Sequence, residues 1–335
     1  MESELFMGCD ISQDNFNYCL RNKSGIVLQG QVTNSSKSIR TWLVELKKKH
    51  QIDLTLILFC IEHTGVYGLL LLRALHEQSL VICLESAVNI KLSLGLQRGK
   101  SDKVDAQRIA EYALRYSDRM KQWCPKRKVI DHLQLLIRLR ERLLKARLEI
   151  SRFNGDAKRF LSKEEYQLVV KGSQVTLKAI EKDIDKADEN IEELIMNDEN
   201  LKKLSRFIRS VDGIGKVTCS AILVRTNEFR DFKEAKKFAC TAGIAPFEHS
   251  SGSSIKGKTR VSHSAHKELK TLIHMCAVGS ISRKGEMKDY FNRKVAQGKS
   301  KMCVINAIRN KLIHRVFAVV RDEVMYQKNY RYKVA

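Results

Sequence analysis

The stretch LFMGCDI at residues 5–11 is an apolar run with an acid near its end, a pattern typical of a buried β-strand. Outward from this run, hydrophobic periodicity and turn residues predict alternating strands and helices. In chain order these are strands at 5–11, 15–20 and 25–28, a helix at 36–49, a strand at 54–61, a helix at 64–78, a strand at 80–84 and a helix from residue 102.

A meander of three strands followed by alternating helices and strands is the plan of an RNase H-like fold. The element order therefore predicts an α/β domain of that type over residues 1–122. In this plan the strand at 5–11 lies in the middle of the sheet, and the strand at 54–61 is adjacent to it.

Four acids gain meaning from this plan. Asp10 lies in the first strand, Glu62 ends the next long buried strand, and Asp102 and Asp105 open a later helix. Two acids three residues apart on a helix have Cβ atoms about 5–6 Å apart and repel each other unless a cation lies between them. Each acid alone has an ordinary explanation, such as a solvated acid in a first helical turn. Together they predict an oxygen-rich site for Mg²⁺ or another hard divalent cation such as Mn²⁺.

The formal net charge of +23 is concentrated in two blocks, net +8 over residues 121–160 and net +14 over residues 251–335. Such blocks are typical of a protein that binds a polyanion, most often nucleic acid. A membrane surface is the weaker alternative, because neither block is a clean amphipathic anchor and no 18-residue apolar run exists.

The nine cysteines are scattered singly, without a C-x-x-C pair. This spacing favours reduced thiols over disulfides or a zinc site. The N-terminus MESE has no signal-peptide form. We therefore expect a cytoplasmic, nucleoid-associated bacterial protein.

The middle of the chain, residues 123–200, is expected to be helical. Apolar residues over 177–194 recur at alternating spacings of three and four, which predicts a short coiled-coil seam. Either a helical hairpin packing on itself or a dimerising coil satisfies this pattern. Arg138, Arg142 and Lys145 in the basic helix before it are candidates for following a phosphate backbone, although a solvated helix face is an alternative explanation.

Residues 201–335 are predicted to be mainly α-helical. Gly213-Ile214-Gly215 joins two helical patterns in the manner of a helix-hairpin-helix, so Gly213, Gly215 and Lys216 are candidates for approaching a phosphate. A tight structural turn is the alternative. The polar stretch 243–258 then reads as a serine-rich and glycine-rich loop.

A serine hydroxyl in this loop can attack a phosphodiester if its leaving oxygen is stabilised, for example by Lys256, Lys258 or Arg260. Chemistry alone does not choose among the four serines of the stretch.

The motifs GCDI (8–11), IEHTG (61–65) and KSDKVDA (100–106) closely resemble the RuvC-like half of the DEDD insertion-sequence transposases. That family includes bridge-RNA-guided recombinases and Piv-type DNA invertases. Residues 243–260 resemble its C-terminal transposase domain. The resemblance assigns Asp10, Glu62, Asp102 and Asp105 to the metal site, and Ser251, directly before the first glycine of the serine cluster, to the nucleophile. Ser250, Ser253 and Ser254 are close enough for a shift of position, and a general-base role for His249 is a hypothesis.

The resemblance implies a transposase or recombinase that acts on donor and target DNA, guided by a structured non-coding RNA. It also implies a homo-oligomer, dimer or tetramer, with a site composed of both halves within or between subunits. Three alternatives stay open: a Piv-type invertase, a RuvC-type junction nuclease that leaves hydrolysed ends, and a non-catalytic nucleic-acid-binding protein.

Overall fold

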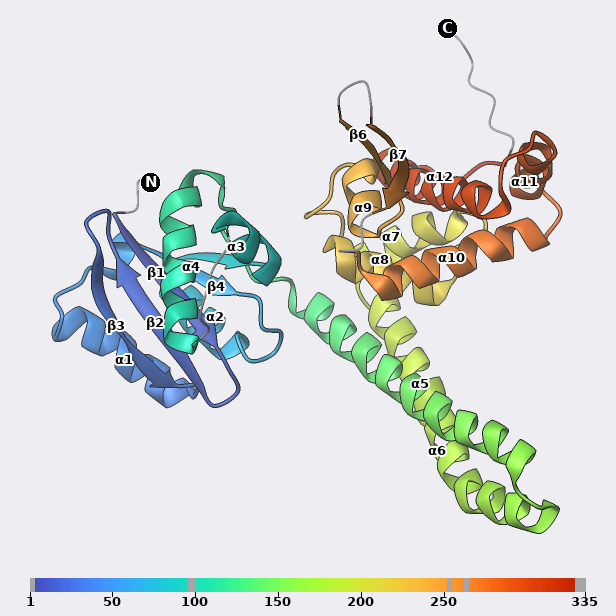
Figure 1. Cartoon of the computed structure of the whole chain (residues 1–335), viewed down its shortest axis with the longest axis horizontal. Helices are drawn as coiled ribbons and strands as arrows, with labels where there is room; N and C mark the ends of the chain where they lie inside the picture. The colour runs from blue at the N-terminus through green and yellow to red at the C-terminus, as the bar shows by residue number, and fades with distance from the viewer. Residues whose placement is uncertain (1–3, 96–100, 252–254, 262–264, 329–335) are drawn as a thin grey trace, which may run out of the picture. The chain divides into compact units, whose positions relative to one another are not determined.

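The computed structural model describes residues 4–95, 101–251, 255–261 and 265–328, and at 156–157 and 247–260 it describes no side chains. The chain divides into two compact units, Met1–Pro125 and Lys126–Ala335, each with a hydrophobic core of its own (Figure 1). The further division of the second unit at residue 200 stays a prediction.

The first unit is built on a five-stranded sheet in the order β3-β2-β1-β4-β5. The strands are β1 (Leu5–Ile11), β2 (Asn15–Arg21), β3 (Ile26–Thr33), β4 (Ile57–Glu62) and β5 (Val81–Glu85). The first three form an antiparallel meander, and β4 and β5 run parallel to β1. This is the RNase H-like arrangement that the sequence predicts, with the strand of Asp10 at its centre.

The helices of this unit cover both faces of the sheet. They are α1 (Ser36–Lys48), α2 (Leu69–Glu77), α3 (Ala87–Ser93) and α4 (Asp102–Tyr116), with single 3₁₀ turns at Leu54–Leu56 and Ser117–Arg119. Met7, Cys9 and Ile11 of β1 share a core with α1 and α2, whereas Phe6 shares one with α3 and α4. Because neighbouring strand residues point to opposite faces, Asp10 lies on the α4 face.

Two predicted boundaries differ for local reasons. The strand expected from residue 54 begins at Ile57, because the Asp53 carboxylate accepts a hydrogen bond from the Thr55 amide (2.9 Å) and caps a 3₁₀ turn. The helix expected from residue 64 begins only at Leu69, after Gly65 adopts a positive φ of 73°. The short α3, capped by Ser86, was not predicted.

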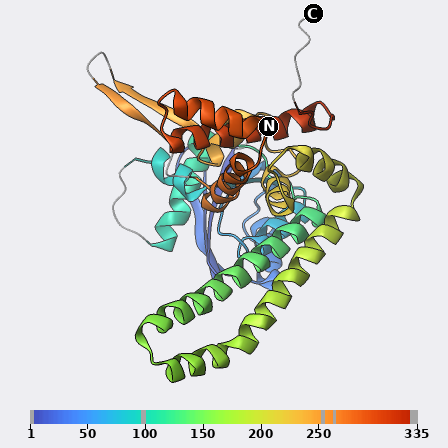
Figure 2. The same cartoon turned by 90° about the vertical axis from the view of Figure 1, so that its right-hand side faces the viewer.

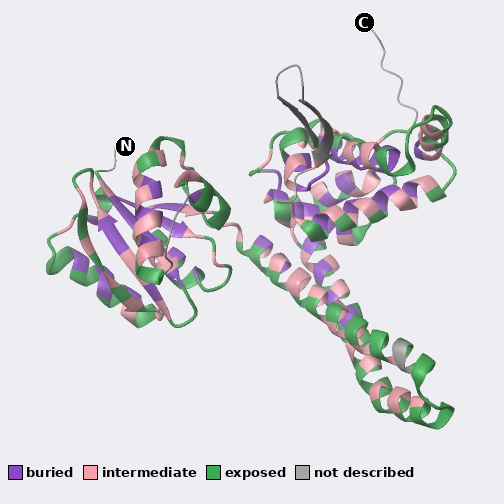
Figure 3. Ribbon diagram, in the orientation of Figure 1, coloured by how far each residue is buried: buried purple, intermediate pink, exposed green. Residues whose placement is uncertain are grey.

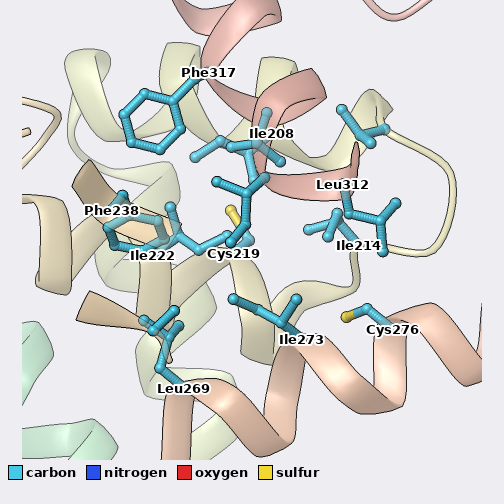
Figure 4. Packing of buried hydrophobic residues seen from close by; sticks show 14 of the residues in the cluster. Ile208, Ile214, Cys219, Ile222, Phe238, Leu269, Ile273, Cys276, Leu312 and Phe317 are labelled. Atoms are coloured by element: carbon cyan, nitrogen blue, oxygen red, sulfur yellow. The ribbon is translucent and has the colours of Figure 1, made fainter. Parts of the chain in front are cut away.

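Among its described residues, the regular structure of the second unit is helical except for one hairpin. Its elements are α5 (Lys128–Phe160), α6 (Lys163–Met196), α7 (Glu199–Ser210), α8 (Lys216–Thr226), α9 (Ala235–Thr241), β6 (Pro246–Ser251), β7 (Ile255–Val261), α10 (Lys267–Ser282), α11 (Glu286–Ala296) and α12 (Lys301–Arg321). Ile208, Ile222, Phe238, Ile273 and Leu312 meet in its core (Figure 4). In the part of the chain that the structure describes, no helix is long and apolar enough to cross a membrane.

Helices α5 and α6 form a long antiparallel hairpin (Figure 2). The predicted seam lies in α6, where Ile184, Ala187 and Ile191 are buried, while the far end of the hairpin is exposed (Figure 3). Across the hairpin, the Arg140 guanidinium donates to the Asp188 carboxylate at 2.6 Å. Of the two interpretations of this region, the structure shows the hairpin; dimerisation through it stays a prediction.

A stretch that the sequence presents as a loop is instead a β-hairpin. Strands β6 and β7 pair antiparallel, with Ser251 opposite Ile255 and Ser250 opposite Lys256. The polar and glycine-rich composition suggested a loop because its apolar residues are few, but backbone pairing needs no apolar side chains. Ser253 and Ser254 lie outside the described residues.

The segment that follows α12 is anchored at Tyr326. The Tyr326 amide donates to the Ser210 hydroxyl at 2.9 Å, and its phenol donates to Glu286 at 3.1 Å. The sequence carried no sign of this, since the partners lie 116 and 40 residues away.

The position of α4 depends on Gly8. A Cβ atom at this position would lie 2.3 Å from both the Ala106 carbonyl oxygen and the Ala110 amide nitrogen. The backbone of α4 therefore packs directly on the backbone of β1 at Gly8, two residues before Asp10. Any side chain at Gly8 must push the helix outward.

We predict that Gly8→Ala destabilises the first unit by about 1–3 kcal/mol, because the added methyl group meets helix backbone that cannot yield without moving the helix. Urea unfolding followed by circular dichroism measures the change. Gly68→Ala is the matched control, since its Cβ would meet only ordinary contacts of 3.6 Å or more. Equal stability of the two variants would contradict the prediction.

Candidate active site

Asp10 and Glu62 are neighbours at one edge of the sheet. Strands β1 and β4 pair in parallel register, with Cys9 beside Ile61 as the last pair. Each of these buried residues is followed by an acid that is partly exposed. Since parallel strands in register keep paired residues on the same face, both carboxylates lie on the face that α4 covers.

Asp102 and Asp105 come to this face through the start of α4. The Ser101 hydroxyl accepts a hydrogen bond from the Val104 amide at 3.3 Å, which fixes the helix start predicted from the sequence. Both acids stand in the first helical turn, where the helix dipole favours negative charge. The close contact at Gly8 brings this turn toward the edge of β1.

All four predicted acids line one cavity of about 530 Å³. The structure thus brings together residues that are up to 95 positions apart in the sequence. The cavity is also lined by polar and basic side chains that sequence reasoning missed: Ser12, Asn17, Lys91 and Arg108. Asn17 could have been found from the sequence, because the pairing of β1 with β2 places it directly opposite Asp10. Lys91 could not have been found in this way, because the short helix α3 that carries it was not predicted.

Arg108 supplies a positive charge inside this cavity. Its guanidinium donates to the Asp105 carboxylate at 2.8 Å, and the two side chains are only 18% and 22% exposed. The pair is a local one, with a spacing of three residues on α4. It stabilises Asp105 next to three other acids and holds that carboxylate toward the helix.

The donor set of the cavity suits a hard divalent cation. Carboxylate and amide oxygens are the ligands that Mg²⁺ prefers, usually together with waters. Among the described residues, however, no three His, Cys, Asp or Glu side chains already converge on one point. The cavity therefore offers oxygen ligands for such a cation in its lining rather than as a formed cluster.

The cysteines next to these acids are not suited to be ligands or nucleophiles. Burial raises the pKa of the Cys9 thiol far above its ordinary value, and the adjacent Asp10 charge raises it further. Burial likewise raises the pKa of Cys60. Thiols bind metals and react as thiolates, so these two stay inert. All nine cysteines are free, although Cys124 and Cys303 are exposed rather than buried.

The second predicted reactive group, Ser251, ends strand β6 in the other unit. The backbone register places it opposite Ile255, the first residue of β7. The predicted cations Lys256, Lys258 and Arg260 occupy alternate positions of β7. The orientations of these side chains are not described.

The remaining predicted contacts with nucleic acid lie on several elements. Arg138, Arg142 and Lys145 share one face of α5, and Lys145 lies 3.6 Å from Glu268 of α10. Gly213 and Gly215 form the turn between α7 and α8, and Lys216 begins α8.

The structure gives Gly213 a packing role. Its φ is +95°, and a Cβ there would lie 2.1 Å from the Ser280 hydroxyl oxygen. Gly215 has open space around it. A phosphate contact at this turn stays a prediction, as do the contacts through α5.

An RNase H-like domain with four carboxylates around one cavity defines a class of proteins that act on nucleic acid. Two family profiles narrow this class. A transposase profile of the DEDD type matches residues 7–154, and the profile described as Transposase IS116/IS110/IS902 family matches residues 205–292. The chain therefore belongs to the IS110-type DEDD transposase family.

Known relatives cover most of the chain. The pilin gene-inverting protein of Moraxella bovis is 28% identical over 97% of this chain and 98% of its own length. The transposase for insertion sequence element IS1111A of Coxiella burnetii is 24% identical over 69% and 70%. Among solved structures, the chain is similar to Thermus thermophilus RuvC in complex with a Holliday junction substrate, with 12% identity, a TM-score of 0.30, and coverage of 36% of this chain and 99% of that one.

We predict that Arg108→Gln binds Mn²⁺ about tenfold more tightly than the wild type, equivalent to ~1.4 kcal/mol, because a competing cation leaves the acid cavity. Electron paramagnetic resonance of free Mn²⁺ measures the affinity. Arg115→Gln on the same helix is the matched control, since Arg115 pairs with Glu111 and does not line the cavity. Unchanged or weaker binding by Arg108→Gln would show that this guanidinium supports the cation site instead.

Proposed function

We propose that this protein is a DNA recombinase of the transposase type, which cuts a phosphodiester and rejoins it to another strand. The observation that carries the proposal is the convergence of Asp10, Glu62, Asp102 and Asp105 on one cavity of an RNase H-like unit. Family membership supplies the reaction class, and the concentrated positive charge supplies the attraction to DNA.

In this proposal the four acids hold Mg²⁺ or a similar cation. When bound, such an ion stabilises the negative charge that develops on a scissile phosphate and its leaving oxygen. The acids bind it through oxygen and keep it at the edge of the sheet. Asn17 and Ser12 provide neutral hydrogen-bonding groups on the same wall.

Ser251 is the proposed nucleophile. Its hydroxyl oxygen attacks the phosphorus, the bond from phosphorus to the leaving sugar oxygen breaks, and the serine proton passes to solvent or to a base while the sugar oxygen gains a proton. The product is a phosphoserine ester to DNA. A hydroxyl of another strand then attacks this ester and releases the serine. The number of phosphoester bonds is conserved, so no outside energy source is required.

DNA is the proposed substrate, and a guide RNA is a further proposal that rests on resemblance to the bridge-RNA-guided members of the family. Inversion of a DNA segment is a second candidate outcome of the same chemistry. It is favoured by the match to the Moraxella gene-inverting protein over nearly the full length of both chains.

We predict that Ser251→Ala abolishes a covalent protein–DNA adduct, because the attacking oxygen is gone. Labelled DNA is incubated with protein and Mg²⁺, and the adduct is detected on a denaturing gel. Ser250→Ala is the matched control and is expected to keep the adduct. Survival of the adduct in Ser251→Ala would move the nucleophile elsewhere. DNA hydrolysis without any adduct would favour a junction nuclease.

We predict that Asp102→Asn lowers metal-dependent strand cleavage at least ~100-fold, because a ligand charge worth several kcal/mol of charge stabilisation is lost. Cleavage of labelled DNA at varied Mg²⁺ measures the effect. Asp118→Asn is the control, since Asp118 is exposed and lies outside the cavity. Full activity of Asp102→Asn would remove Asp102 from the site. Absence of cleavage in the wild type under all divalent metals, with retained DNA binding, would favour a non-catalytic binding protein.

A further inference from the structure

A buried arginine stands apart in the second unit. Arg309 on α12 is 7% exposed, and none of the described acids forms an ion pair with it. Its guanidinium donates to the His274 Nδ1 atom of α10 at 2.5 Å and makes a long contact of 3.5 Å to the Asn306 side-chain oxygen. Its Nε atom has no hydrogen-bond partner among the described residues.

Such an arrangement is costly. A guanidinium carries five N–H donors and a charge that proteins do not neutralise by deprotonation. Burying a charge without a counter-charge is strongly unfavourable, and each unsatisfied donor adds to that cost. Burial accordingly lowers the pKa of Arg309.

Arg127, in the same unit, shows the surroundings of an arginine with a structural role. Arg127 donates to the Asp198 carboxylate at 2.7 Å and to the fully buried Glu228 carboxylate at 2.8 Å. These hydrogen bonds raise the pKa of Arg127, most strongly the one to Asp198. Arg309 has no equivalent partner among the described residues. Its environment therefore resembles that of a ligand-binding cation more than that of a structural clamp.

His274 is matched to this role. The guanidinium can only donate, so the His274 Nδ1 atom accepts its N–H. Burial, followed by the charge of Arg309, lowers the pKa of His274 below the ordinary value, which favours this arrangement. Lys270 stands one helical turn before it on α10 and adds a further positive charge on that side of the helix. An incoming anion would therefore meet only cations and neutral donors among these three side chains.

The location connects this pair with the hairpin that carries Ser251. Asn306, one turn before Arg309 on α12, donates to the Ile244 carbonyl at 3.0 Å. Ile244 is two residues before the start of β6. Arg309 therefore lies beside the anchor of the β6–β7 hairpin, within the block of residues 251–335 that carries a net charge of +14.

We propose that Arg309, together with His274, binds one backbone phosphate of DNA beside the base of the β6–β7 hairpin. The planar guanidinium fork matches phosphate oxygens and would gain the counter-charge that none of the described acids supplies. This inference rests on the proposed function only in taking DNA as the substrate. It concerns binding, whereas Ser251 and the acid cavity concern the reaction.

The test is the salt dependence of DNA affinity, measured by fluorescence anisotropy of a labelled duplex with the full chain. Loss of one phosphate contact lowers the magnitude of the slope of log affinity against log salt by about 0.9. We expect this decrease for Arg309→Met, with affinity several-fold weaker at a fixed moderate salt concentration. Arg321→Met is the matched control, because Arg321 is on the same helix, is 75% exposed and pairs with Asp322. It is expected to keep the wild-type slope.

Equal slopes and affinities for Arg309→Met and the wild type would overturn the proposal. If Arg309→Met fails to fold, Arg309→Lys replaces it in the test, because lysine keeps the positive charge but lacks the planar guanidinium. Weaker affinity with an unchanged slope supports the phosphate site, and wild-type affinity refutes it. Stabilisation of the wild type, but not of Arg309→Lys, by inorganic phosphate without any change in DNA binding would assign a free-anion site and refute the DNA assignment.

The two proposals fail separately in this experiment. A wild type that binds DNA through Arg309 but forms no serine adduct would refute the proposed reaction and keep the phosphate site. If the wild type forms the adduct but the salt slope does not change on mutation of Arg309, the proposed reaction would stand and the phosphate site would be refuted. A wild type that does not bind duplex DNA at all would refute both.

Discussion

The contact between the backbones of β1 and α4 at Gly8 is the constraint on which the acid cavity depends. Only a glycine allows the helix to lie 2.3 Å from where a Cβ would stand. Because the helix rests there, its first turn reaches the edge of the sheet where Asp10 and Glu62 end their strands. The cavity is thus a consequence of helix–sheet packing. This packing brings the four acids to the lining of one cavity without requiring contacts between their side chains.

The two units differ in the arrangement of their charged side chains. The first gathers four carboxylates and places a single partly buried arginine, Arg108, among them. The second carries most of the positive charge and buries one arginine with two acids and another with none among the described residues. In our proposals, a bound cation would balance the carboxylates of the cavity in the first unit, and a phosphate would balance Arg309 in the second.

The fold of the first unit was accessible from the sequence because its signals are local. Strand alternation, turn residues and the Ser101 cap each act over a few residues, and the connection rules then leave few topologies. The hairpin at 246–261 was missed because polar residues paired through the backbone leave no hydrophobic period. The anchoring of Tyr326 was missed because its partners are distant in sequence.

By itself, the sequence determined which residues are candidates for the chemistry. Residue type, element order and motif predict Asp10, Glu62, Asp102 and Asp105 as the metal site. Only the tertiary structure decided what surrounds them. The placement of Lys91 in the cavity and the lone buried charge of Arg309 depend on how helices pack onto a sheet or onto one another. Such packing is set by contacts between residues far apart in the chain, which local periodicity does not record.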